Sequence, residues 1–94
     1  MTHTTSPARR RESTSMLQWI FSRNCAVLTC ELDADPRGGF EVSVIPHWNV
    51  SSAAIEHFDG ARDAFRRHAE LARYLRETGW HLENRRQRHA VRAA

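Results

Sequence analysis

The feature that most constrains the fold is one long helical pattern that begins after Asp59-Gly60 and ends before Gly79. Asp59 is a suitable N-cap, and Gly79 suits the left-handed residue that follows a helix, with Trp80 placed to pack back on the helix end. At about 100° per residue, the apolar side chains of residues 61–78 fall on a single arc. This arc comprises Ala61, Ala64, Phe65, His68, Leu71, Ala72 and Leu75.

The segments before the helix alternate between apolar and polar side chains, as strands do. Residues 25–32 and 40–45 each alternate with a period of two, and the turn-rich segment 33–39 separates them, which predicts a β-hairpin. Its predicted inward side chains are Ala26, Leu28, Cys30, Leu32, Phe40, Val42 and Val44. Residues 16–22 fit a strand but also one helical turn, and residues 80–83 resume the alternation. Residues 46–58 are predicted as a connection with a short helical turn at 52–58.

The predicted fold is therefore of the α+β class. It is a small antiparallel sheet of three to four strands with one long helix packed on one face, in the order β-β-β-α-β or β-β-α-β. Residues 16–83 are predicted to form the single domain. Residues 1–15 are predicted as a disordered basic N-terminal tail and residues 84–94 as a basic C-terminal tail, because both lack the apolar side chains that a core needs.

The positive charge of the chain is concentrated at its two ends. Residues 1–24 and 83–94 each have four arginines against one glutamate, a net charge of +3, whereas residues 25–82 have a net charge of −3. Arginine binds phosphate well, so the ends predict an alternative function in which a nucleic-acid-associated accessory protein makes sequence-independent phosphate contacts. The arginines predicted to make these contacts are Arg9, Arg10, Arg11, Arg85, Arg86 and Arg88.

No motif in the sequence specifies a catalytic or metal site. The six histidines do not have the H-E-x-x-H or related spacings of zinc sites. Cys25 and Cys30, five apart in a strand-like run, are predicted to lie on opposite faces and too far apart to bond. His68, near the middle of the apolar arc, is predicted to be a buried histidine with one hydrogen-bond partner. We expect no enzyme activity, no metal and no cofactor.

The leading hypothesis is a small non-enzymatic binding protein that associates with another protein or with itself as a homodimer. A sheet with one helix leaves its second face to water or to a partner, and Ile20, Val27 and Ile45 are predicted on that face. His47 and Trp48, in the segment Pro46–Asn49, follow a strand end, where functional side chains often lie. The alternative for Trp48 is that it folds back over the edge of the core.

The sequence also bears on where the protein resides. No stretch approaches the roughly 20 apolar residues of a membrane span, and the basic N-terminal residues are not followed by the apolar region of a secretory signal. We therefore expect a cytoplasmic protein without membrane contact.

Overall fold

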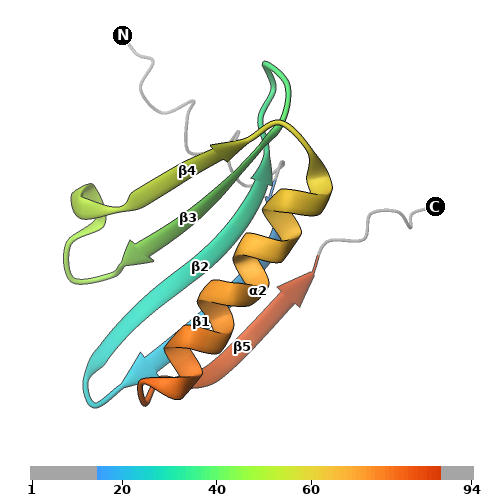
Figure 1. Ribbon diagram of the computed structural model, residues 1–94. Coiled ribbons are helices and arrows are strands. Elements are labelled where there is room, and N and C mark those ends of the chain that lie inside the picture. Colours follow the sequence, from blue (N-terminus) through green and yellow to red (C-terminus); the bar gives the residue numbers. More distant parts are fainter. Residues whose placement is uncertain (1–14, 88–94) are drawn as a thin grey trace, which may run out of the picture.

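The computed structural model describes residues 15–87, which form a five-stranded antiparallel sheet with one long helix packed on one face (Figure 1). The strand order is β4-β3-β2-β1-β5. The elements follow the chain as β1 (Ser15–Arg23), β2 (Ala26–Ala34), β3 (Phe40–Pro46), the 3-10 turn η2 (Val50–Ser52), β4 (Ala54–Phe58), α2 (Ala61–Glu77) and β5 (His81–Gln87). The predicted α+β class is confirmed, and the sheet has five strands rather than three to four.

Strand β4 is the element missing from the sequence prediction. The predicted helical turn at 52–58 is wrong: the chain forms η2 and then β4, which pairs with β3 along its whole length. β4 lies at an edge of the sheet, and only Phe58 of its five residues packs against the core. A mostly exposed edge strand needs little apolar alternation, so its sequence has a weak strand signal.

The first and the last of the described strands are neighbours in the sheet. Residues 16–22, which fit a strand or a helical turn, lie in β1, and β1 pairs with β2 on one side and with β5 on the other. β5 continues to Gln87, so residues 84–87, predicted as the start of the C-terminal tail, belong to the sheet. The rest of the two predicted tails, residues 1–14 and 88–94, lies outside the described residues.

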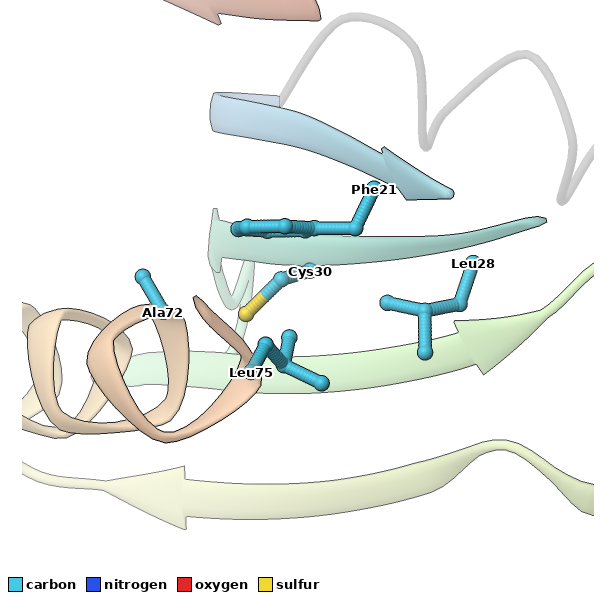
Figure 2. Packing of buried hydrophobic residues seen from close by; sticks show 5 residues of the cluster. All are labelled: Phe21, Leu28, Cys30, Ala72 and Leu75. Carbon is cyan, nitrogen blue, oxygen red and sulfur yellow. The ribbon is translucent and has the colours of Figure 1, made fainter. Parts of the chain in front are cut away.

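The core lies between the sheet and α2 in two adjoining clusters. Phe21, Leu28 and Cys30 of the sheet meet Ala72 and Leu75 of the helix (Figure 2). The second cluster, nearer the start of the helix, consists of Leu17, Leu32, Val42 and Ala64. Six of the seven hairpin side chains predicted to point inward therefore pack in the core, and the exception is Ala26. The side chains between them lie on the opposite face, which we call the open face.

Two details of the predicted helix are corrected. Gly60, not Asp59, is the N-cap, so the helix begins without a side-chain capping bond. The Asp59 carboxylate instead lies 3.5 Å from His57 Nε2. Phe65, predicted in the core, is 39% exposed because it lies beside the line of Ala64, His68, Ala72 and Leu75 that faces the sheet. The predicted end is confirmed: Gly79 has a φ of +98°, and the Trp80 N–H donates to the Leu75 carbonyl at 2.9 Å.

His68 is the buried polar side chain at the centre of this packing. It is 1% exposed, and its Nε2 lies 3.1 Å from the Cys30 carbonyl oxygen. Because a carbonyl only accepts hydrogen bonds, Nε2 carries the hydrogen. The ring also meets Trp19 edge-on, with the centroids 5.1 Å apart. The predicted single hydrogen-bond partner is confirmed, and burial lowers the pKa of His68 below its usual value of 6.5.

We expect this histidine to make the fold sensitive to mild acid. Its pKa is lower in the folded state than in the unfolded state, so its stabilising effect is complete above about pH 6.5 and is lost as the pH falls below that value. The measurement is urea denaturation between about pH 7.5 and pH 5. His68→Gln keeps a donor for the Cys30 carbonyl but does not titrate, so its free energy of unfolding should vary less with pH. His81→Gln, at an exposed histidine, should behave as the unmodified protein; equal pH profiles for all three would contradict this assignment.

Candidate protein-binding site

The segment Pro46–Asn49 is held at the end of the sheet where β2 begins and β3 ends. Pro46 pairs with Leu28 in the antiparallel register, and the His47 N–H donates to the Val27 carbonyl at 2.9 Å. The Asn49 N–H donates to the Pro46 carbonyl at 3.2 Å, which closes a turn. Since the ladder fixes one side of this turn, Trp48 at its tip has a defined position on the surface.

Trp48 stacks on Trp80, the residue that follows the C-terminal glycine of α2. The two ring centroids are 6.4 Å apart with an interplanar angle of 17°. Trp80 is half-buried and packs against the core, whereas Trp48 is 62% exposed. The Trp48 ring thus contacts the edge of the core through Trp80, while most of its surface faces solvent. A binding role for Trp48 stays a prediction.

A shallow hollow of about 500 Å³ lies beside the stacked pair. Its lining is mostly apolar and consists of Cys25, Ala26, Val27, His47 and Trp48. We call these five residues together with Trp80 the Trp48 patch. The patch contains no carboxylate and no guanidinium group, and this distinguishes it from the charged outer side of α2.

His47 lines this hollow and is anchored from the open face. Its Nε2 lies 2.7 Å from the hydroxyl oxygen of Thr29, which is buried. A hydrogen bond of this length to a rigid strand residue restricts the imidazole ring. His47 therefore has a fixed orientation beside Trp48.

The structure brings the predicted sheet-face residues to the same end of the open face. Ile20 and Ile45 are the register neighbours of Thr29, on β1 and β3 respectively, and Val27 lies one row closer to the hollow. All three are half-buried. Val27 is thus joined to His47 and Trp48 in the Trp48 patch, and Ile20 and Ile45 continue the apolar surface away from it.

The other end of the open face is acidic, which the sequence analysis did not predict. There, ligand atoms of Asp35, Glu41 and His57 lie within 4.8 Å of one another. His57 Nδ1 is 3.6 Å from Asp35, and the N–H of Arg37 donates to the Asp35 carboxylate at 3.0 Å, which lowers the pKa of Asp35. Two carboxylates and an imidazole can ligate a divalent cation, but exposed acidic groups are common without one.

The residues of the nucleic-acid alternative are only partly described. The guanidinium carbon of Arg85 lies 5.3 Å from the Trp19 ring centroid, a cation–π contact. Arg86 lies in β5 opposite Gln18. Arg9, Arg10, Arg11 and Arg88 lie outside the described residues.

The two cysteines differ in their surroundings. Cys25 lies in the β1–β2 turn and is exposed, whereas Cys30 is fully buried in the core, and both are free thiols. Burial raises the pKa of Cys30 to about 12, so this thiol is a poor nucleophile at neutral pH.

None of the helices in the described part of the chain combines the length and apolarity needed to cross a membrane. No protein-family model, curated protein or solved structure matches this chain.

Proposed function

We propose that this protein is a small non-enzymatic binding module that acts by protein–protein association through the Trp48 patch, and that the patch takes up a second copy of the same chain. The observation that carries the proposal is the exposed Trp48 indole, stacked on Trp80 and bordered by an apolar hollow.

The stacking explains why this tryptophan suits binding. Tryptophan is among the residues that contribute most to interface energies, especially beside an apolar pocket. The contact with Trp80 and the turn at Pro46–Asn49 already restrict Trp48 before any partner arrives. Binding then loses little side-chain entropy, which favours affinity.

The choice of a second copy follows from the shape of the patch. A projecting ring and a hollow lie side by side on one surface, so two copies related by a two-fold axis can place each Trp48 ring in the hollow of the other. The hollow falls in the range of about 300–1,000 Å³ that is typical of sites for compact ligands. Because the patch carries no carboxylate or guanidinium group, its two copies meet without repulsion between like charges.

We expect the full-length protein to self-associate in a concentration-dependent way and Trp48→Ala to weaken this association at least about tenfold, as for a hot-spot residue. Sedimentation equilibrium over a wide concentration range measures both. Tyr74→Ala is the matched control, because Tyr74 is an aromatic residue of similar exposure, 61%, that lies on α2 and neither stacks on Trp80 nor lines the hollow.

Two results would refute the proposal. One is a protein that stays monomeric at high concentration, and the other is a Trp48→Ala variant that associates as strongly as Tyr74→Ala. The second hypothesis, association with nucleic acid through the arginine-rich ends, stays a prediction, since Arg9, Arg10, Arg11 and Arg88 lie outside the described residues.

A further inference from the structure

The open face carries three acidic side chains that are close neighbours in the sheet. Glu31 and Asp33 lie two residues apart on β2, and Glu41 on β3 is the register partner of Asp33. We call these three residues the acidic row. Because they alternate with the core residues Cys30, Leu32 and Val42, their side chains lie on the face opposite α2.

Two of the three residues in the acidic row are buried, although no element of residues 15–87 covers this face (Figure 1). Glu31 is only 5% exposed and Asp33 only 9%. Burying a carboxylate is costly unless hydrogen bonds and an opposite charge compensate for the lost water.

Within the described residues, the side chains that donate hydrogen bonds to the Glu31 carboxylate are uncharged. Its carboxylate accepts hydrogen bonds from Gln18 Nε2 at 2.9 Å and from the Ser15 hydroxyl at 3.3 Å. The ion pairs formed between described side chains lie on α2, at β4 and around the Asp35 turn, and none of them involves Glu31 or Glu41. This part of the open face is therefore suited to a positively charged occupant.

The chain itself supplies such an occupant next to the acidic row. Ser15, the first described residue, is the register partner of Asp33, and three consecutive arginines, Arg9–Arg11, precede it in the sequence. Three residues, 12–14, separate Arg11 from Ser15, and the four steps from one residue to the next span roughly 13–14 Å in extended form. Neighbouring strands are only about 4.8 Å apart, so a segment of this length can reach across β2 to β3.

We propose that residues 9–11 lie across the open face of their own chain, with their guanidinium groups paired to Glu31 and Glu41. Guanidinium groups form bidentate pairs with carboxylates. The short connection to β1 gives the segment a high effective concentration at the face, which favours binding within one chain over binding between chains.

The test is paramagnetic relaxation enhancement in the full-length protein, with a spin label attached at position 8 through the substitution Ala8→Cys. The same chain carries Cys25→Ser, because Cys25 is exposed and would also react, whereas Cys30 is fully buried. We expect the label to broaden the amide signals of Glu31, Ser43 and their neighbours more than those of residues on the outer side of α2, such as Ala69. High salt should reduce this broadening, because it screens the ion pairs.

Matched substitutions test whether charge pairing is the cause of the selective broadening. Replacing Arg9, Arg10 and Arg11 with Gln should abolish the selective broadening. Replacing Arg62, Arg73 and Arg76 with Gln alters the net charge equally on the exposed side of α2 and should leave the broadening in place. On the acidic side, Glu31→Gln with Glu41→Gln keeps the side-chain shapes and should also abolish it.

Three results would overturn the proposal. The first is no selective broadening of the open face, and the second is broadening that survives the replacement of the arginines at 9–11. The third is broadening seen only when spin-labelled chains are mixed with unlabelled, isotope-enriched chains, because the arginines would then occupy a second copy.

Discussion

Phe21→Ala is expected to lower the free energy of unfolding by about 3–5 kcal/mol. Phe21 is completely buried, and its ring lies between β1 and the C-terminal half of α2, against Leu28, Cys30 and Leu75 (Figure 2). Its truncation removes apolar contacts and leaves a cavity that the paired strands on either side cannot close. Because a domain of this size has a total stability of only roughly 4–11 kcal/mol, the loss should remove a large part of it.

Thermal and urea denaturation followed by circular dichroism measure this loss. Ile55→Ala is the matched control, since Ile55 is 60% exposed on the edge strand β4 and its truncation should change the stability by no more than about 0.5 kcal/mol. If both variants lost the same small amount, the packing of α2 on β1 described here would be incorrect.

Gly39→Ala is the second substitution with a large expected effect. Gly39 ends the β2–β3 turn at a φ of +86°, and a Cβ there would lie 2.6 Å from the Phe58 carbonyl oxygen and 2.8 Å from the His57 ring. The neighbouring Gly38, at a φ of +114°, has open space at the same position. Both alanine variants carry backbone strain, but only Gly39→Ala also pushes β4 away from β3.

We therefore expect Gly39→Ala to destabilise the fold by about 1–3 kcal/mol more than Gly38→Ala. Amide hydrogen exchange of β4 residues should accelerate in the first variant and change little in the second. Equal stabilities and equal exchange rates would show that the turn and β4 do not approach as closely as the structure has them.

The parts of the fold that were predicted from the sequence are those with a one-sided apolar pattern. The helix and the β2–β3 hairpin each bury one face, so their periodicity is strong, and Gly79 with Trp80 fixed the end of α2. β4 was missed because an edge strand with four exposed residues and one half-buried residue has little pattern to detect. The N-cap prediction was one residue off: Gly60 is the N-cap, and the Asp59 carboxylate lies beside His57 of β4, a strand that was not predicted.

Three residues of the candidate site, Val27, His47 and Trp48, were predicted from the sequence, whereas Cys25, Ala26 and Trp80 and the geometry of the site were not. A strand end followed by Pro46-His47-Trp48 indicated a surface with a tryptophan, yet its contact with Trp80 depends on how the last turn of α2 meets the start of β2. The acidic end of the open face was harder to foresee. Its members are separated in the chain, and only the register of β2, β3 and β4 brings Asp35, Glu41 and His57 together.

The position of β1 between β2 and β5 has a consequence for biosynthesis. β1 is made first and β5 last among the described strands, so β1 can pair with β2 early but has no partner on its other side until residues 81–87 have left the ribosome. Such long-range pairing is slow to form, and an unpaired strand edge invites contacts with other chains. On a polysome, a nascent chain that still lacks β5 has an open edge at β1, and the β5 of a completed neighbour can pair there. Exchange of β5 between copies is therefore the misfolding route that the topology favours.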